Sequence, residues 1–211
     1  MPAREEVRMK IAVFGASGMV GSRVVAEAAA RGHEVLALSR SGSAVEGATE
    51  SRSGDMGDAA TVSEVAAAND VVISATGPSR TGAPHGEWLA AVTTLLENAG
   101  GTRIVFTGGA GSLSVNGIRL VDGPGFPDAY KPEALTGYEA LKAFAATDAK
   151  TQPWSYISPA PEIAPGTAVA DYKVELETPA GPFVSAETFA KALVDEAETG
   201  AHNGVRFTVA D

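Results

Sequence analysis

The chain has 211 residues, a hydrophobic fraction of 45% and a formal net charge of −10 at pH 7. This length suits one globular domain, and the acidic charge argues against a nucleic-acid partner, because phosphate binding needs a basic stripe. There is no cysteine, and His33, His85 and His202 lie far apart in the sequence, so disulfides, thiol chemistry and a bound metal are not expected.

The first ten residues, MPAREEVRMK, carry both charge signs and lack the apolar core of a signal peptide. No apolar run in the chain approaches the ~20 residues that span a bilayer. We therefore expect a cytoplasmic protein without a membrane partner, in which residues 1–9 form a flexible N-terminus.

Strand and helix patterns alternate in the first half of the chain. Residues 10–16 (KIAVFGA) are a nearly continuous apolar run, which is typical of a strand buried on both faces. Residues 18–31 carry apolar side chains at helical spacing, and Gly32 ends that helix. The further elements predicted in this half are strand 34–40, a weaker third strand ending at 53–58, helix 59–68, strand 70–77, helix 85–100, and a strand with a glycine loop at 103–111.

This alternation predicts parallel strands with helices on both faces of the sheet. We expect an α/β, Rossmann-type doubly wound sheet in the order 3-2-1-4-5-6. After residue 111 the pattern loosens into a small C-terminal elaboration of the same single domain, 1–211. The elements predicted there are a helix near 133–150, a sixth strand and proline loop within 153–166, one or two short strands around 168–174, helix 185–198, and strand 205–211.

Three glycines, Gly15, Gly18 and Gly21, lie between the first strand and the first helix. A tight turn and a close approach of the backbone to a pyrophosphate both favour residues without a Cβ, and the N–H groups at the helix start supply donors and positive potential. Because strand, loop, helix and next strand follow in this order, we predict dinucleotide binding rather than a purely structural turn. The expected contacts are Gly15, Ala16, Ser17, Gly18, Met19 and Val20.

The end of the second strand indicates which dinucleotide binds. An NAD site usually has a carboxylate there for the ribose hydroxyls, but this chain has Leu38, Ser39 and Arg40. A guanidinium and a hydroxyl suit a 2′-phosphate. We therefore predict NADP (NADPH) as the cofactor, with Ser39 and Arg40 as contacts; the alternative is that Arg40 is a solvated loop residue.

Small and polar residues at the ends of later strands are expected to line the same crevice. Asp55 and Met56 follow the third strand, where Asp55 either contacts the adenine edge or serves only in a turn. The short side chains that end the fourth strand let the cofactor lie against the backbone. These further predicted contacts are Ala75, Thr76, Gly77 and, after the fifth strand, Gly109.

The chain resembles the NmrA-like branch of the atypical short-chain dehydrogenase/reductase superfamily in KIAVFGASGMVGSRVVAEAAARGHEVLALSR, GDMGDAATV and NDVVISATGP. Four later segments narrow the resemblance to bacterial proteins named NADH-flavin reductases, which are similar to biliverdin reductase B. These segments are RIVFTGGAGSL, LVDGPGFPDAYKPEAL, WSYISPAPEIAPG and VRFTVAD. This resemblance implies a bound nicotinamide cofactor and reduction of a flavin or similar planar substrate. It also implies that residues 108–112 and 158–161 flank the nicotinamide.

Many reductases of this superfamily use a Tyr-x-x-x-Lys pair with an upstream serine, and the lysine lowers the pKa of the tyrosine that transfers the proton. This chain has Tyr138 and Lys142 on one helix face, and Ser112 upstream. The three are candidate catalytic residues. The alternative is that Tyr138 packs on the helix and Lys142 is solvated, since this branch commonly lacks the pair.

We expect an NADPH-dependent oxidoreductase that transfers hydride to a small-molecule acceptor, a flavin or quinone-like compound, and that is a monomer or homodimer. A non-catalytic NADP-binding redox sensor of the NmrA-like type is the alternative. A sugar epimerase or dehydratase is disfavoured because the C-terminal part is short. His85, Trp88 and Trp154 either reach the cleft or pack in the fold.

Overall fold

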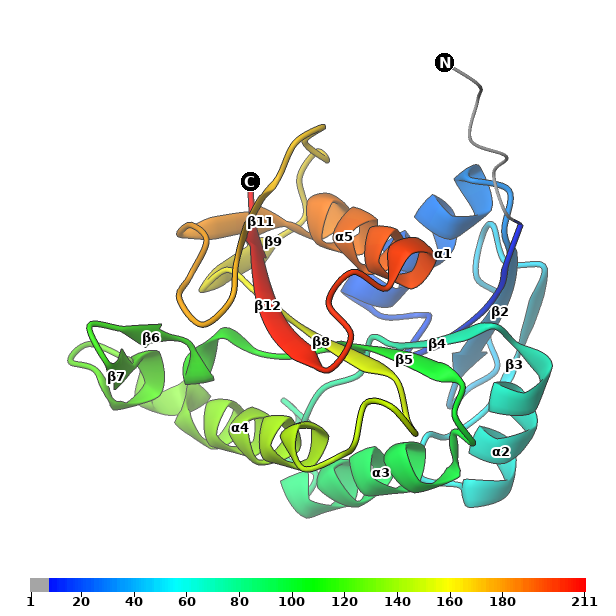
Figure 1. Cartoon of the computed structure of the whole chain (residues 1–211), viewed down its shortest axis with the longest axis horizontal. Coiled ribbons are helices and arrows are strands. Elements are labelled where there is room, and N and C mark those ends of the chain that lie inside the picture. The colour runs from blue at the N-terminus through cyan, green and yellow to red at the C-terminus, as the bar shows by residue number, and fades with distance from the viewer. Residues whose placement is uncertain (1–7) are drawn as a thin grey trace.

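The computed structural model describes residues 8–211. Its centre is an eight-stranded sheet in the order β10-β12-β8-β5-β4-β1-β2-β3 (Figure 1). The predicted order 3-2-1-4-5-6 is confirmed, with β8 as the sixth strand and two more strands beyond it. All neighbours pair in parallel except β10 with β12. The strands are β1 (Lys10–Phe14), β2 (Glu34–Ser39), β3 (Glu50–Ser53), β4 (Val71–Ser74), β5 (Arg103–Thr107), β8 (Trp154–Pro159), β10 (Lys173–Glu175) and β12 (Val205–Ala210).

Helices cover both faces of this sheet, as predicted. In Figure 1, α1 and α5 lie above the sheet, while α2, α3 and α4 lie below it. None of the helices within residues 8–211 has the length and apolar character to cross a membrane. Their bounds are α1 (Met19–Ala30), α2 (Ala59–Ala68), α3 (His85–Asn98), α4 (Lys131–Ala145) and α5 (Ala186–Thr199).

The side chains of β1 show how the two cores form. Ile11 and Val13 pack in the core beneath α1 and α5, whereas Ala12 and Phe14 pack in the core beneath α2, α3 and α4. Successive side chains of a strand point to opposite faces, so a strand buried on both sides needs an uninterrupted apolar run. Each of these four residues is at most 1% exposed.

The predicted flexible N-terminus, residues 1–9, lies mostly before the first described residue. Residues 1–7 of the predicted flexible segment lie outside the described residues. In the described part, the amide of Met9 donates to His33 Nδ1 at 3.3 Å and its carbonyl accepts from the amide of Glu34 at 2.9 Å. The flexibility of residues 1–9 stays a prediction.

The second half of the chain departs from the predictions in small elements. The helix α4 ends at Ala145, five residues before the predicted end. The predicted strand around 168–174 is β10, which begins only at Lys173 and extends the main sheet. The elements not predicted are β6 (Ser114–Val115) paired with β7 (Ile118–Arg119), β9 (Glu162–Ala164) paired with β11 (Phe183–Ser185), and three short 3-10 turns, η1 (Ala110–Ser112), η2 (Leu120–Asp122) and η3 (Asp128–Tyr130).

Candidate functional site

The glycine loop between β1 and α1 is shaped by contacts that exclude side chains. Gly15 has φ +77°, and a Cβ on it would lie 2.7 Å from the carbonyl oxygen of Ala75 at the end of β4. A Cβ on Gly21 would lie 2.1 Å from the carbonyl oxygen of Gly15. Both obstacles are backbone atoms, which cannot rotate away. The first and third glycines of the motif are therefore required by the close packing of loop, helix and neighbouring strand.

The same loop is held in place by backbone hydrogen bonds. The amides of Gly15 and Ala16 both donate to the carbonyl of Leu38 in β2, at 3.0 and 3.1 Å. The helix α1 begins at Met19, and no side chain within residues 8–211 caps its N-terminus at Gly18. The amides of the first turn carry positive partial charge there, which makes the helix start a favourable place for an anion.

This geometry fits the pyrophosphate of a dinucleotide. The loop presents backbone N–H groups and no Cβ at its tightest points, and a phosphate group needs close approach to such donors. Of the predicted contacts, Ser17, Gly18 and Met19 are exposed, Gly15 and Val20 are partly buried and Ala16 is buried. The amide of Gly18 donates to the carbonyl of Gly15 at 3.0 Å, so the exposed donors of this segment that remain for a phosphate are the Ser17 hydroxyl and the amides of Ser17 and Met19.

Serine residues and one arginine surround the end of β2. The side chain of Arg40 is exposed, and among residues 8–211 no carboxylate forms an ion pair with it. Ser39 Oγ lies 3.4 Å from Ser41 Oγ, which lies 2.8 Å from Ser43 Oγ. A cation beside several hydroxyls suits a phosphate. Ser41 and Ser43 were not predicted, although the run SRSGS shows hydroxyls at alternate positions.

The segment after β3 contributes a turn and a buried thioether. Asp55 is exposed, and its Oδ1 accepts a hydrogen bond from the amide of Gly57 at 2.7 Å, which is the contact of a turn aspartate. Met56 is buried, with its sulfur 3.4 Å from Ser74 Oγ at the end of β4. The structure thus places Met56 beneath the crevice and Asp55 at its surface.

The end of β4 is tied to α3. The amide of Ala75 donates to the carbonyl of Phe14 at 2.9 Å, and Thr76 Oγ1 accepts from Trp88 Nε1 at 3.1 Å. Gly77 is exposed, with nothing within 4 Å of a Cβ placed on it. Ala75 and Thr76 therefore border the glycine loop, and Trp88 lies against this border.

His85 joins the loop after β4 to α4. Its Nδ1 lies 2.9 Å from Thr136 Oγ1, and its Nε2 lies 2.9 Å from the carbonyl oxygen of Ser79. In the same loop, Arg80 forms a two-pronged pair with Glu133 of α4. Both contacts hold residues 77–84 against the first turns of α4.

The loop after β5 contains one glycine that the core requires. A Cβ on Gly108 would lie 1.9 Å from the ring of Tyr156, whereas a Cβ on Gly109 would meet nothing within 4 Å. Burial raises the pKa of Tyr156, so its hydroxyl stays neutral, and it donates to the carbonyl of Gly137 at 2.9 Å. The space beside the Cα of Gly109 therefore holds no protein atom within 4 Å of where a Cβ would lie.

Of the three candidate catalytic residues, Tyr138 and Lys142 lie next to each other on α4, whereas Ser112 is bound to a residue of β12. Ser112 is buried, and its Oγ accepts from Nη1 of the buried Arg206 in β12 at 3.2 Å. Tyr138 lies two residues, about 200° around the helix axis, from the buried positions Thr136 and Ala140, so it faces away from the sheet.

The ring of Tyr138 lies against Arg119, whose guanidinium carbon is 4.6 Å from the ring centroid. Lys142 Nζ lies 5.4 Å from the same centroid and pairs with Glu139 at 2.6 Å. These contacts match the packing alternative. The catalytic assignment of Ser112, Tyr138 and Lys142 stays a prediction, without support from their placement.

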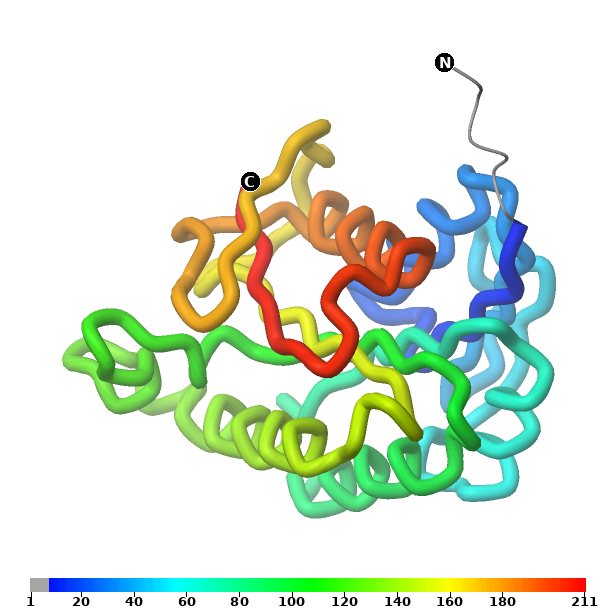
Figure 2. Tube along the Cα trace, viewed as in Figure 1, coloured from blue at the N-terminus to red at the C-terminus, as the bar shows by residue number. Residues whose placement is uncertain are grey.

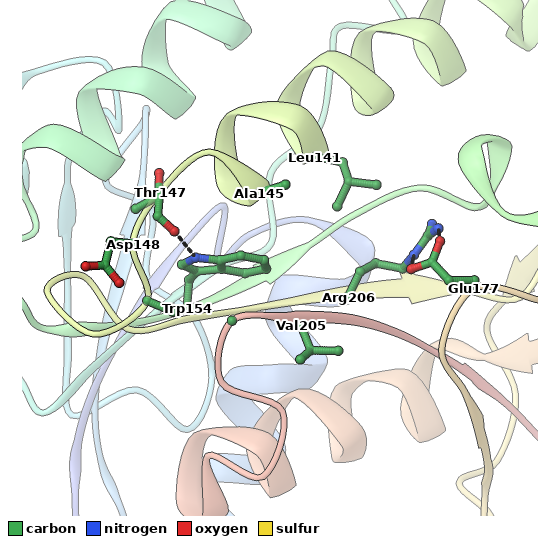
Figure 3. A pocket seen from close by; sticks show the side chains of 10 residues that line it. Leu141, Ala145, Thr147, Asp148, Trp154, Glu177, Val205 and Arg206 are labelled. Atoms are coloured by element: carbon green, nitrogen blue, oxygen red, sulfur yellow. Dashed lines mark hydrogen bonds and ion pairs between the residues drawn. The ribbon is translucent and has the colours of Figure 1, made fainter.

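A separate cavity of about 520 Å³ lies between the C-terminal half of α4 and the start of β12 (Figure 3). Its lining contains none of the residues predicted to bind the cofactor or to act in catalysis. Trp154 forms one wall, and its indole N–H donates to the carbonyl of Thr147 at 3.2 Å. Trp154 is 4% exposed, so it packs in the core.

Comparisons with known proteins agree with this geometry. A family model described as NAD(P)H-binding matches residues 15–199. The chain is 34% identical over 223 aligned positions to the uncharacterized protein YwnB of Bacillus subtilis (strain 168), covering 95% of this chain and 98% of that protein. The region matched by the family model begins at Gly15, the first glycine of the loop.

Two solved structures superimpose closely. A protein from Burkholderia pseudomallei described as a "putative exported protein" has a TM-score of 0.85 and 38% identity, covering 96% of this chain and all of that one (100%). A protein from Streptococcus pneumoniae TIGR4 described as "a putative NADH-flavin reductase" has a TM-score of 0.82 and 28% identity, covering 96% and 99%. The similarity to such reductases inferred from the sequence motifs is thereby confirmed.

Proposed function

This chain belongs to the NAD(P)H-binding family, and from that premise we propose that it is an NADPH-dependent oxidoreductase that reduces a flavin or quinone-like acceptor. One observation carries the proposal: the loop at the start of α1, which has glycine at its tightest points and no side-chain cap, lies beside the ends of β2 and β4, where a dinucleotide crosses such a sheet. The proposed cofactor contacts are Gly15, Ala16, Ser17, Gly18, Met19, Val20, Ser39, Arg40, Asp55, Met56, Ala75, Thr76, Gly77 and Gly109.

The preference for NADPH over NADH follows from the end of β2. An exposed guanidinium without a carboxylate partner, next to Ser39 and Ser41, favours the 2′-phosphate of NADPH. A carboxylate, which would favour the free ribose hydroxyls of NADH, is absent from residues 38–43. Ser41 and Ser43 join the proposed contacts as further hydroxyl donors.

The proposed acceptor class has two supports. The Streptococcus pneumoniae structure is that of a protein named for flavin reduction. The second support is that a flavin acceptor needs little acid–base help from the protein, because solvent can supply the proton that accompanies hydride transfer, and Tyr138 and Lys142 face away from the sheet. When bound, the reduced nicotinamide supplies the hydride.

The chain's own residues then bind the cofactor and the acceptor, orient them toward each other and exclude water from between them. The open backbone at Gly109 gives a planar ring room to lie against the loop after β5. The segment 77–84, held by His85 and Arg80 to α4, covers the neighbouring side. These two segments and residues 158–161 are proposed to border the acceptor.

The experiment is a comparison of NADPH oxidation by the purified protein with and without FMN, riboflavin or a quinone. Acceptor-dependent oxidation above the protein-free rate is expected. NADPH binding without acceptor-dependent oxidation would instead favour the alternative, a redox sensor that binds NADP and performs no chemistry. Failure to bind either nicotinamide would contradict both functions.

A further inference from the structure

The central sheet has two edges of different chemistry. The β3 edge reads Glu-Ser-Arg-Ser and contains no apolar residue, and its Arg52 pairs with Glu64 at 2.9 Å. The β10 edge reads Lys-Val-Glu, and all three residues are exposed, with Val174 at 40%. Within residues 8–211 no strand pairs with the outer side of β10. An unpaired edge without proline and with an apolar centre is a template for pairing with another chain.

Exposed apolar side chains gather next to this edge. The amide of Ser114 donates to the carbonyl of Glu177 at 2.9 Å, which brings the β6–β7 hairpin beside the chain leaving β10. Figure 2 shows this chain in gold, running beside the red β12 and turning close to the green hairpin. Four of the eight large hydrophobic residues that are exposed within 8–211 belong to these two segments: Val115 (46%), Ile118 (55%), Val174 (40%) and Leu176 (51%).

We propose that two copies of the chain pair through antiparallel β10 strands and form a two-fold dimer with one continuous sheet. With the two-fold axis at Val174, the two valines lie opposite each other. Lys173 then faces the partner's Glu175, and Glu175 faces the partner's Lys173. Directly opposite residues in an antiparallel pair have Cβ atoms about 4.5–5.5 Å apart, where opposite charges stabilise and like charges destabilise the pair.

The charges select both the partner and the register. An axis at residue 173 would place two lysines opposite each other, and an axis at residue 175 would place two glutamates opposite each other. The strand is thus complementary to itself in one arrangement, as a two-fold interface requires. Lys173 Nζ also donates to the main-chain carbonyl of Asp211, and because an ammonium has three donors it can keep this bond within the dimer.

The proposed interface leaves the cofactor crevice free. Four strands separate β10 from β1, which places the glycine loop five strand spacings away, roughly 24 Å at about 4.8 Å for each. Dimer formation and nicotinamide binding are therefore independent. A variant that loses the dimer should keep its affinity for the cofactor.

The test is sedimentation velocity over a concentration series of the full chain. The wild type should sediment as a dimer, and Lys173→Glu and Glu175→Lys should each sediment as a monomer, because each creates two like-charge pairs. Lys150→Glu, an exposed lysine outside the patch, is the matched charge control and should stay dimeric. Circular dichroism of each variant checks that the fold is retained.

Two rescue measurements identify the pairing itself. The double variant K173E/E175K restores both opposite-charge pairs and should be dimeric again. An equimolar mixture of K173E and E175K should form a heterodimer, because each Glu then faces a Lys. A wild type that remains monomeric at the highest concentration, single variants that dimerise like the wild type, or folded rescue samples that stay monomeric would overturn the proposal.

Discussion

At the scale of single residues, two features define the proposed cofactor crevice. One is the set of backbone positions that have no room for a Cβ, and the other is an arginine side chain that forms no ion pair within the described residues. Gly15 and Gly21 lie against backbone carbonyls, whereas Gly109 faces open space. Arg40 is exposed without an ion pair in the described chain, whereas Arg206 is buried and bound to Ser112 and Glu177. The first arginine can therefore meet a ligand, and the second holds the fold together.

Replacing Gly21 by alanine should weaken NADPH binding by roughly tenfold or more. The added Cβ would lie 2.1 Å from the carbonyl oxygen of Gly15, so the loop must move out of the conformation that receives the pyrophosphate. Restoring that conformation on binding brings back an overpacking cost of about 1–3 kcal/mol, where 1.4 kcal/mol is tenfold in affinity. Fluorescence titration measures the change. Gly86→Ala, whose Cβ meets nothing within 4 Å, is the control and should bind as the wild type does. Unchanged affinity in Gly21→Ala would contradict the assigned loop geometry.

Replacing Tyr138 by phenylalanine should leave acceptor-dependent turnover within about twofold of the wild type. The ring would keep its contacts with Arg119 and Lys142, and the lost hydroxyl faces away from the sheet. A proton donor typically contributes a factor of about 10²–10⁴. A loss of that size in steady-state kinetics, with the fold intact, would reinstate the Tyr-x-x-x-Lys assignment.

The sequence was sufficient to predict the positions of candidate site residues that follow from the local backbone, while their role in binding stays a proposal. The glycines and Arg40 occupy fixed places relative to a strand and a helix, so their positions could be inferred from spacing. The role of Ser112 could not be inferred in this way, because its partner Arg206 lies 94 residues further along the chain. Only the pairing of β12 with β8 brings that guanidinium to the loop after β5.

At the scale of elements, the parallel half of the sheet was predictable because each strand is buried on both faces and each helix has one apolar face. The strands β6, β7, β9 and β11 have two or three residues each, too few to show a periodic pattern. The pairing partner of β11, β9, lies about twenty positions away, and no local signal announces it. For these short strands, the Asn116–Gly117 dipeptide is a sequence signal, because Asn-Gly favours the two-residue turn of a β-hairpin. In the structure both residues have the positive φ that this turn requires.

Replacing Gly137 by alanine should stabilise the protein by about 0.5–1 kcal/mol. Gly137 lies inside α4, and a Cβ there meets nothing within 4 Å. Glycine in a helix interior costs about that much relative to alanine. The carbonyl that accepts from Tyr156 is unaffected by the change. Urea unfolding measures the difference, and a lower midpoint in the variant would show that the site lacks the open space described.

At the scale of the whole molecule, the first and last helices are joined by ion pairs. Arg31, which directly follows α1, contacts Asp195 at 2.7 Å and Glu198 at 2.9 Å in α5, and Arg23 of α1 contacts Glu187 of α5 at 2.6 Å. These pairs lie beside the core that α1 and α5 bury together on one face of the sheet. They link residues near the start of the described chain to residues near its end.

Acid should loosen this connection. Burial favours the neutral acid, but hydrogen bonds from Lys191, Tyr172 and Arg31 outweigh it and hold the pKa of Asp195 below its ordinary value. A lowered pKa in the folded state adds stability above the unfolded-state pKa of about 3.9, and this contribution is lost as the pH falls through the folded-state value.

Asp195→Asn should therefore be less stable than the wild type at pH 7, by about 2 kcal/mol for lost hydrogen bonds to a charged group. The difference should shrink toward pH 3. Urea unfolding at pH 7, 5 and 3 tests both statements. A gap of constant size across this range would contradict the role given to the carboxylate.

The most direct test of the proposed cofactor site is a titration of the protein with NADPH and NADH, for the wild type and for Arg40→Ala. The wild type should bind NADPH more tightly than NADH. The variant should lose roughly tenfold or more in NADPH affinity, about the 1.5–3 kcal/mol of a hydrogen bond to a charged group, while NADH binding changes little. Equal affinity for both dinucleotides, unchanged by the substitution, would contradict the assignment of Arg40 to the 2′-phosphate.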